Sequence, residues 1–316
     1  MKLFDRNKLN IKPLSARESK SDTSIFINPE SLAAKITQQE SAKIKAIAEA
    51  IKESKKNNAP VIFSFGAHFI KNGLSLILIE LMKKGYVQHI LGNGAVSIHD
   101  WELAFQGKTE EDVKKYVKEG QFGIWQETGF YINKAINLHP ELGYGEALGK
   151  FICESKISHP HKHQSVLAQS YQLKIPASIC TSIGHDIIYT HPECKGESIG
   201  KASYIDFLKF AATIENFENA TYISIGSAIT SPMVFEKALS MAKNLAIQQH
   251  KKLENYTLVV NDIQPGDWDW KKGEPSKDNP AYYLRFCKTF SRMGGDFQYI
   301  RMDNKAFLHN LYHQLK

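Results

Sequence analysis

The chain has 316 residues, of which 42% are hydrophobic and 23% are charged. This is the composition of an ordinary globular protein, and it excludes an intrinsically disordered chain. Lysine and arginine number 40 against 33 acidic residues, which gives a formal net charge of +7. The basic residues are spread along the chain and form no stripe with interleaved aromatic residues, so we expect no nucleic-acid partner.

The apolar runs and the cysteines indicate neither a membrane protein nor a secreted one. No apolar run approaches the roughly 20 residues that cross a bilayer, and the N-terminus lacks the apolar core of a signal peptide. The four cysteines lie far apart and form no C-x-x-C pair, so neither a disulfide framework nor a thiolate zinc site is predicted. We therefore expect a cytoplasmic protein without a membrane partner.

Short β-rich runs alternate with helical patterns along most of the chain. Residues 1–35 are rich in Ser, Asp, Asn and Pro, and we expect them to form an irregular N-terminal arm. Helical patterns predict helices at 41–57, 74–84, 110–118, 129–138, 165–173, 205–214, 234–245 and 281–293. Runs of β-forming residues predict strands at 61–65, 87–91, 177–181, 221–225, 256–260 and 298–302. This alternation predicts an α/β fold, with a single Rossmann-like domain over residues 36–316 and a mostly parallel sheet covered by helices on both faces.

Small and polar residues follow strand after strand. In an open parallel sheet, ligands bind beyond the carboxyl ends of the strands. Glycine there lets a phosphate approach the backbone, and aspartate can accept hydrogen bonds from a ribose. The residues of this kind are His68, Asn93, Gly94, Ala95, Gly226, Ser227, Asn261, Asp262 and Asp303. Each one alone also fits a tight turn, and no G-x-G-x-x-G or P-loop motif is present, but their recurrence predicts a nucleotide-binding crevice.

Two other features allow more than one interpretation. His159, His161 and His163 alternate along the chain and suggest a divalent metal site. Alternating side chains on an extended strand lie about 7 Å apart, however, which favours a polar loop over three ligands on one ion. Trp268 and Trp270 lie in a polar loop, where they either form an aromatic wall for a cationic ligand or anchor the loop or a subunit contact.

Several segments, taken in order, resemble the deoxyhypusine synthase family over roughly residues 60–310. GAHFIKNG at 66–73 and NGAVSIHD at 93–100 stand where the family has T-S-N-x-x-S-S-G and T-A-G-G-x-E-E-D. HDIIYTH at 185–191 resembles the family's G-D-M-I-F-F-H, and the tripeptide GSA at 226–228 resembles its G-G-G. The order and spacing of these pieces carry the resemblance.

The resemblance implies a homotetramer with a Rossmann-like fold, with NAD held at the strand ends and active sites shared between subunits. The family oxidises spermidine and moves its aminobutyl group to an enzyme lysine and then to a lysine of a translation factor. By position, the strand-end residues named above would face NAD. His99 and Asp100 would replace the family's Glu-Asp pair, and Asp186 would hold an amine of the substrate.

The chain departs from the family where the covalent step takes place. Arg285 stands at the lysine position, and a guanidinium stays protonated and does not readily form an imine. Lys288, one helical turn further on, is the remaining candidate nucleophile. We therefore expect an NAD-dependent enzyme acting on an amine or related small substrate without the covalent lysine step. His99 would be its acid/base and Asp186 would hold the substrate cation. The alternative is a non-catalytic NAD- or nucleotide-binding or assembly module.

Overall fold

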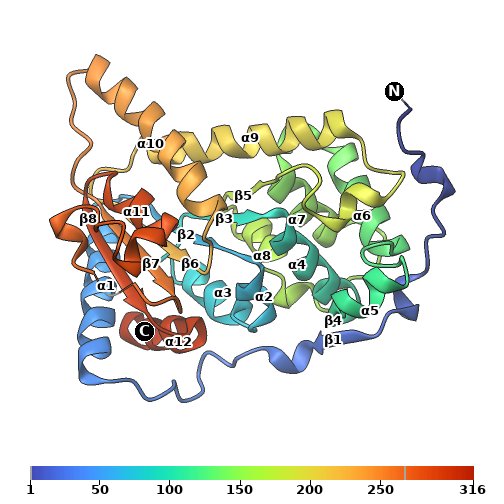
Figure 1. The fold of residues 1–316 in the computed structure, drawn as a ribbon, viewed down its shortest axis with the longest axis horizontal. Coiled ribbons are helices and arrows are strands. Elements are labelled where there is room, and N and C mark those ends of the chain that lie inside the picture. Colours follow the sequence, from blue (N-terminus) through green and yellow to red (C-terminus); the bar gives the residue numbers. More distant parts are fainter. Residues whose placement is uncertain (1, 267) are drawn as a thin grey trace.

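The computed structural model describes residues 2–266 and 268–316. At its centre lies a sheet of parallel strands in the order β5-β3-β2-β6-β7-β8 (Figure 1). The strands are β2 (Val61–Phe65), β3 (His89–Asn93), β5 (Ala177–Cys180), β6 (Thr221–Ile225), β7 (Thr257–Asp262) and β8 (Asp296–Arg301). Counted along the chain within this sheet, the order is the 3-2-1-4-5-6 arrangement of dinucleotide-binding folds. The predicted α/β class with a parallel sheet is therefore confirmed.

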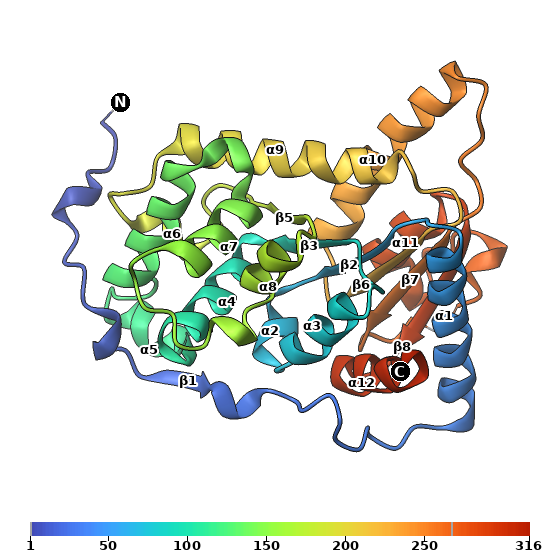
Figure 2. The ribbon, with the colours of Figure 1, turned by 180° about the vertical axis from the view of Figure 1, so that it is seen from behind.

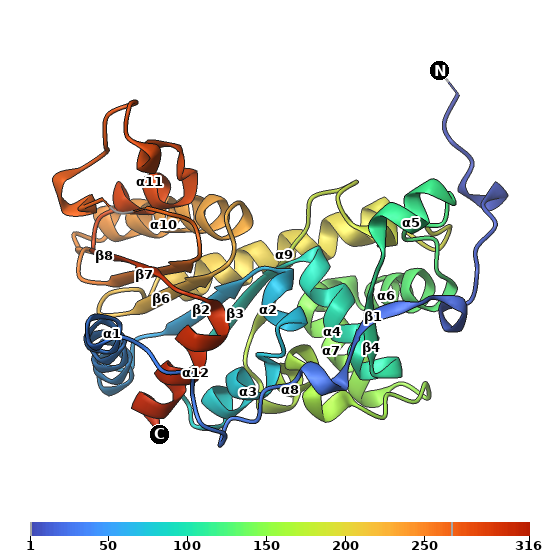
Figure 3. The same ribbon diagram turned by 60° about the horizontal axis from the view of Figure 1, so that its bottom comes forward.

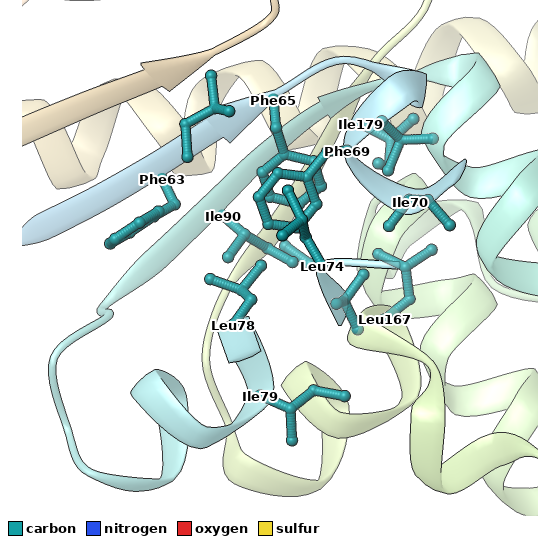
Figure 4. Packing of buried hydrophobic residues seen from close by; sticks show 14 of the residues in the cluster. Phe63, Phe65, Phe69, Ile70, Leu74, Leu78, Ile79, Ile90, Leu167 and Ile179 are labelled. Atoms are coloured by element: carbon teal, nitrogen blue, oxygen red, sulfur yellow. The ribbon is translucent and has the colours of Figure 1, made fainter. Parts of the chain in front are cut away.

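The central strands are apolar on both faces because helices cover both faces of the sheet. In β2, Phe63 and Phe65 belong to one buried cluster, whereas Ile62 points the other way into a second cluster. Figure 4 shows the first cluster, in which the rings of Phe65 and Phe69 stack with centroids 4.2 Å apart. In the sequence, a strand buried on both faces is a run of mostly apolar residues without polar alternation. The strand β2 has the bounds that the sequence predicts.

The helices lie in two layers, one on each face of the sheet (Figure 3). The first cluster joins the sheet to α1 (Gln38–Lys56), α3 (Ser75–Lys83), α8 (Val166–Leu173) and α12 (Asn304–Leu315). The second cluster joins it to α9 (Gly196–Ile214), α10 (Thr230–Gln248) and α11 (Arg285–Ser291). The other helices are α2 (Ala67–Lys71), α4 (Gly94–Gln106), α5 (Val113–Lys118), α6 (Gln126–Leu138) and α7 (Tyr144–Glu154). Because the covering helices change face after β5, the winding of the sheet reverses between β2 and β6.

Side chains of α9 cover the open edge of β5. The Asp206 carboxylate accepts hydrogen bonds from the backbone N–H groups of Ile179 at 2.7 Å and Gly145 at 2.9 Å. The Ser203 hydroxyl accepts one from the N–H of Thr181 at 3.0 Å and lies 3.2 Å from the carbonyl oxygen of Ile179. Burial raises the pKa of Asp206 to about 7. These bonds occupy backbone groups that would otherwise invite pairing with another chain.

The N-terminal segment is more ordered than the sequence predicts. It runs along the outside of the molecule (Figure 2), and its strand β1 (Ser19–Asp22) pairs antiparallel with β4 (Lys108–Glu111). The helix predicted at 110–118 begins only at Val113, because its first residues belong to β4. Both strands are short and polar, so neither shows the hydrophobic pattern from which a strand is predicted.

Other differences concern bounds and helices that the sequence does not reveal. The strand predicted at 87–91 lies two residues later, and the helix predicted at 281–293 is a short 3-10 turn, Pro280–Tyr283, followed by α11. Helix α4 is buried along most of its length and therefore has no polar face that would mark its period. Among residues 2–266 and 268–316, no helix is long and apolar enough to cross a membrane.

A buried ion pair ties the N-terminal segment to α4. Both guanidinium NH groups of Arg17 lie 2.8 Å from the Glu102 carboxylate, and each side chain is only 1% exposed. Nearby, Leu14 is buried in the first cluster. Removing one partner of such a pair leaves an uncompensated charge in the interior.

We expect the substitution Arg17→Met to lower the free energy of unfolding by about 3–5 kcal/mol, because it leaves the Glu102 carboxylate buried without its cation. Urea unfolding followed by circular dichroism measures the loss. The double variant R17M/E102Q should lose less than the sum of the two single variants. Lys52→Met, which breaks the exposed pair with Glu49, is the matched control and should change little. Similar losses of unfolding free energy in R17M and K52M would contradict the assignment of Arg17 and Glu102 as a buried ion pair.

Candidate active site

Two glycines meet where the winding of the sheet reverses. The strands β2 and β6 end side by side, with Phe65 paired to Ile225, and Gly66 and Gly226 follow them. A Cβ atom on Gly66 would lie 2.5 Å from the carbonyl oxygen of Gly226, so only glycine fits there. Gly226 has φ +55° and open space where its own Cβ would be. This is the position at which doubly wound sheets bind dinucleotides.

Several of the polar residues predicted to face a cofactor close helices and turns. Asn93 accepts a hydrogen bond from the N–H of Val96 at 3.1 Å and caps α4. Ser227 accepts one from the N–H of Ser231 at 3.2 Å, at the start of α10. Asp303 caps α12 through two backbone N–H groups, and Asp262 accepts from Gln264 N–H at 3.0 Å. These residues have local structural partners, as N-cap residues commonly do.

Asn261 differs from these residues because its bonding is incomplete. Its amide nitrogen donates to the carbonyl oxygens of Ile300 at 3.2 Å and Met302 at 2.9 Å. Its Oδ1 atom is buried and has no hydrogen-bond partner within the described parts of the chain. An orphaned acceptor beside the glycine pair fits a ligand that brings a donor to this edge. His68 is exposed on α2 near the same edge.

A cavity of about 220 Å³ lies on the other side of the glycine pair, between the N-terminal segment, α2, α4, β4 and residues 185–187. It is lined by both His99 and Asp186, which are 87 residues apart in the chain. Ala95, predicted to face the cofactor, also lines it. Its other titratable lining residues are Arg17, Lys71, Glu102, Glu110, Glu111 and His185. The structure therefore brings together two of the three predicted catalytic residues.

Most of the acids in this cavity already have partners. Glu102 pairs with Arg17, and Glu110 lies 3.3 Å from the Lys71 ammonium. Glu111 accepts hydrogen bonds from the Trp125 indole at 2.8 Å and the Gly123 N–H at 3.2 Å. The Asp186 carboxylate has neither an ion pair nor a hydrogen bond among the residues that the structure describes. The cavity thus holds more carboxylates than cations, an environment that attracts a positively charged ligand.

Gly94 makes room for the Asp186 carboxylate at the start of α4. A Cβ atom on Gly94 would lie 2.1 Å from Oδ2 of Asp186, so no other residue fits without displacing the acid. Burial raises the pKa of Asp186 to about 6, and His185 opposes that shift. A carboxyl group with such a pKa and no partner gains its charge most easily when a cation is beside it.

His99 is held by β4. Its Nδ1 atom lies 2.7 Å from the hydroxyl of Thr109, which in turn lies 2.7 Å from the Glu102 carboxylate. Burial lowers the pKa of His99 to about 4, and the neighbouring Glu102 opposes the shift. The imidazole is therefore neutral near pH 7 and can accept a proton or a hydrogen bond.

Asp100 lies away from this cavity. Its carboxylate accepts hydrogen bonds from the Ser165 hydroxyl at 2.5 Å and from the N–H groups of Val166 at 2.8 Å and Leu167 at 3.2 Å. It therefore holds the N-terminus of α8, and burial raises its pKa to about 6. The structure does not bring it together with His99 and Asp186.

The three alternating histidines do not converge. His159 is buried against the rings of Trp101, Phe105 and Phe151, with Nδ1 2.9 Å from the carbonyl oxygen of Ile157. The His161 ring lies against Gly107 instead, and His163 is exposed. Within the described residues, no three His, Cys, Asp or Glu side chains are placed to hold a metal ion.

The two tryptophans anchor their loop. Trp270 is buried in the second cluster, with its ring centroid 6.1 Å from that of Phe297. The Trp268 indole donates to the carbonyl oxygen of Gly273 at 2.8 Å, within the same loop. Both contacts hold the segment to itself and to the sheet, as the anchoring interpretation expects. Asp267, which precedes Trp268, lies outside the described residues.

Arg285 and Lys288 line a separate cavity of about 750 Å³ beside α10 and α11. The Lys288 ammonium lies 2.5 Å from Glu274 and 4.0 Å from the centroid of the Tyr282 ring. The hydrogen bond to Glu274 raises the pKa of Lys288. A nucleophilic lysine needs the opposite shift, because only the neutral amine attacks a carbonyl or imine carbon.

Sequence reasoning did not find the residues that surround His99. Arg17 lies in the segment predicted to be irregular, and Thr109 and Glu110 belong to the unpredicted strand β4. Arg17 and Glu110 line the cavity, and Thr109 lies behind His99 in the strand that pairs with β1, with Ser21 opposite Thr109. No local pattern in the sequence indicates this pairing.

Comparison with known proteins places the fold. A model of the family described as "Arginine dihydrolase ArgZ-like, C-terminal, Rossmann fold" matches residues 45–121. Unliganded AgrE is similar with a TM-score of 0.55 and 19% identity, over 90% of this chain and 34% of AgrE. A protein from Methanococcus maripaludis S2 assigned to the LOR/SDH group has a TM-score of 0.51 and 18% identity, over 92% of this chain and 73% of that protein.

The chain spans about a third of the AgrE chain, so these likenesses show the Rossmann fold and no more. A protein from Entamoeba histolytica assigned as a deoxyhypusine synthase matches with a TM-score of 0.44 and 12% identity, over 82% of this chain and 91% of that protein. That likeness is too weak to support the resemblance seen in the sequence. No curated protein matches the sequence.

Asp186 and Asp100 have similar pKa values, but we expect their substitution to change the free energy of unfolding in opposite directions. Because its folded-state pKa is raised, the Asp186 carboxylate lowers stability above pH 6 and has no such effect below about pH 4. We expect Asp186→Asn to raise the free energy of unfolding at pH 7.5 by about 1–2 kcal/mol and to change little at pH 4.

Asp100→Ala should lower the free energy of unfolding by about 1–3 kcal/mol at pH 7.5, because it leaves the hydroxyl and two N–H groups at α8 without their acceptor. Thermal unfolding of both variants across pH 4 to about 8 tests the pair. A destabilised D186N at pH 7.5 would show that the Asp186 carboxylate has a structural partner after all.

Proposed function

We propose that the chain binds NAD(H) at the carboxyl edge of the sheet and acts on a small amine in the cavity of His99 and Asp186. The observation that carries the proposal is the Asp186 carboxylate, half-buried, without a partner in the described chain and facing a cavity with excess negative charge. A protonated amine supplies the charge that this site lacks.

Three features support a dinucleotide. The strand order is that of dinucleotide-binding sheets, Gly226 has open space beside it where the winding reverses, and the buried Asn261 Oδ1 lacks a donor within the described chain. AgrE, with a similar fold, is known in a ternary complex with ornithine and NAD⁺. That complex pairs the same cofactor with an amine-bearing ligand, which supports the proposal by analogy.

The chemistry follows from the states of the two side chains. A bound nicotinamide would accept a hydride from the carbon that bears the amine. The Asp186 carboxylate would pair with the ammonium and orient it, and the neutral His99 imidazole would accept the proton that leaves the substrate. The paired acids Glu102 and Glu110 would favour the imidazolium that forms, since both raise the pKa of His99.

An assembly or nucleotide-binding module is the second candidate. Large apolar side chains are exposed on loops that follow strands, at Ile183, Ile229 and Ile263, and on the 3-10 turn that ends at Tyr283. Each of the four is 69–74% exposed. Such side chains could be buried by contact with another chain. A second copy of the same chain would fit the homo-oligomer that the family resemblance implies. This candidate predicts dinucleotide binding without turnover.

Equilibrium binding tests the cofactor. We expect millimolar NAD⁺ or NADH to raise the thermal midpoint, with about 2.7 kcal/mol of stabilisation when the ligand is at 100 times its Kd. Gly66→Ala should abolish this stabilisation, because its Cβ would collide with the Gly226 carbonyl. Gly200→Ala, where a Cβ meets nothing, is the matched control and should keep it. The absence of any stabilisation in the natural chain would refute the cofactor.

Turnover tests the amine. A panel of small primary amines that includes spermidine and ornithine is incubated with NAD⁺, and NADH formation is followed by absorbance. We expect His99→Gln and Asp186→Asn to lower the rate by about 10²-fold or more while leaving NAD⁺ binding intact. Glu53→Gln, on the exposed face of α1, should leave the rate unchanged. Dinucleotide binding with no turnover of any amine would favour the assembly module.

Borohydride trapping tests the covalent route. We expect no aminobutyl adduct after incubation with spermidine and NAD⁺, because Arg285 keeps its proton and the bond to Glu274 holds Lys288 in its charged form. Peptide mapping by mass spectrometry is the measurement. A stable adduct on Lys288 or on another lysine would refute the prediction.

A further inference from the structure

We propose that Thr109 is a positioning residue that holds His99 in the tautomer with its proton on Nδ1, leaving Nε2 as a hydrogen-bond acceptor for the substrate. The inference rests on the proposed function, in which His99 accepts a proton. Its structural basis is a chain of hydrogen bonds that starts at Arg17 in the N-terminal segment and ends at the imidazole.

The first links of this chain fix the state of Glu102. Arg17 donates to both carboxylate oxygens at 2.8 Å, and Thr128 donates to Oε1 at 2.7 Å. The pair with Arg17 holds the pKa of Glu102 below its usual range against the effect of burial. Glu102 is therefore ionised and has only acceptors to offer. The Thr109 hydroxyl, 2.7 Å from Oε2, must be the donor in that contact.

The next link fixes the tautomer of His99. A hydroxyl has one hydrogen, and Thr109 gives it to Glu102. Toward Nδ1 of His99, at 2.7 Å, the same oxygen can only accept, so Nδ1 carries the imidazole proton. Nε2 then has a free lone pair, and no hydrogen bond to it is formed by the described residues. Because His99 lines the cavity, this lone pair is the atom available to a ligand.

This arrangement restricts what can react. The substrate must present an N–H or O–H group to Nε2; that bond breaks, the proton moves to Nε2, and the Nδ1–H bond to Thr109 persists in the imidazolium. The charged groups around His99 come from four elements. Glu102 on α4 and Glu110 on β4 favour the imidazolium, whereas Lys71 on α2 and Arg17 oppose it. A ligand that brings only acceptors, such as a carboxylate alone, finds no partner at Nε2.

Nitrogen NMR of the histidine rings tests the assignment directly. The full chain is labelled with ¹⁵N-histidine, and His99 is identified among the 12 histidines by its loss in His99→Gln. We expect one neutral tautomer, protonated on Nδ1, at pH 7. Thr109→Ser keeps the hydroxyl and should preserve that signature. Thr109→Val keeps the shape but lacks the acceptor, and should shift both ring nitrogens toward values averaged over the two tautomers.

His89 is the internal control for folding. It is buried between the hydroxyls of Thr213 at 2.8 Å and Ser178 at 2.9 Å, and its signals should be the same in every variant. A proton on Nε2 in the natural chain would overturn the proposal, even if Thr109→Val failed to fold. So would an unaltered Nδ1–H signature in a folded T109V. The spectra require no cofactor, so a failure of NAD(H) binding, measured separately by thermal shift, would be distinguishable.

Discussion

The buried pair of Arg17 and Glu102 is the constraint on which the geometry of the candidate site depends. Two charges removed from water are tolerable only when each satisfies the other and the remaining donors and acceptors are filled. Glu102 meets this condition with two bonds from Arg17 and one each from Thr109 and Thr128. Those four bonds join the N-terminal segment, α4, β4 and α6. The N-terminal segment, α4 and β4 all line the cavity, and the Glu102 carboxylate holds these three elements together.

The second constraint is close approach at the carboxyl edge of the sheet, where two glycines admit groups that any side chain would exclude. Gly66 admits the carbonyl of Gly226, and Gly94 admits the carboxylate of Asp186. The first approach brings the ends of β2 and β6 together at the reversal of winding, and the second places an acid beside the first turn of α4. The chain thus lacks G-x-G-x-x-G although its strand order is that of dinucleotide-binding sheets, and its close approaches rest on single glycines after different strands.

The sequence allowed the sheet to be predicted much better than the site. Runs of mostly apolar residues such as VIFSF and TYISI mark strands that are buried on both faces. The strands β2 and β6 have their predicted bounds. His99 and Asp186, which line the cavity, were named from the positions that the family resemblance gives them. Arg17 and Thr109 could not be found, because Arg17 lies just before β1, Thr109 lies in β4, and this short polar strand pair has no hydrophobic period. Nor could sequence separate Asp100 from His99, its neighbour, since only the packing of α8 shows that Asp100 caps a helix.

The polar residues along this edge differ in how completely they are hydrogen-bonded. Asn93 and Asp303 cap helices, and Ser227 accepts a hydrogen bond from Ser231 in the first turn of α10. Such local roles alone account for a polar residue after a strand. Asn261 Oδ1, the Asp186 carboxylate and Nε2 of His99 have no hydrogen bond within the described chain. Asn261 Oδ1 is buried, where an unmet acceptor is unfavourable, and the other two residues line the cavity. All three are acceptors. Asn261 ends β7, on one side of the glycine pair, and Asp186 follows β5, on the other. The dinucleotide and the amine that we propose would together complete this bonding, because the amine would carry positive charge to Asp186 and the dinucleotide would lie along the carboxyl edge of the sheet near Asn261.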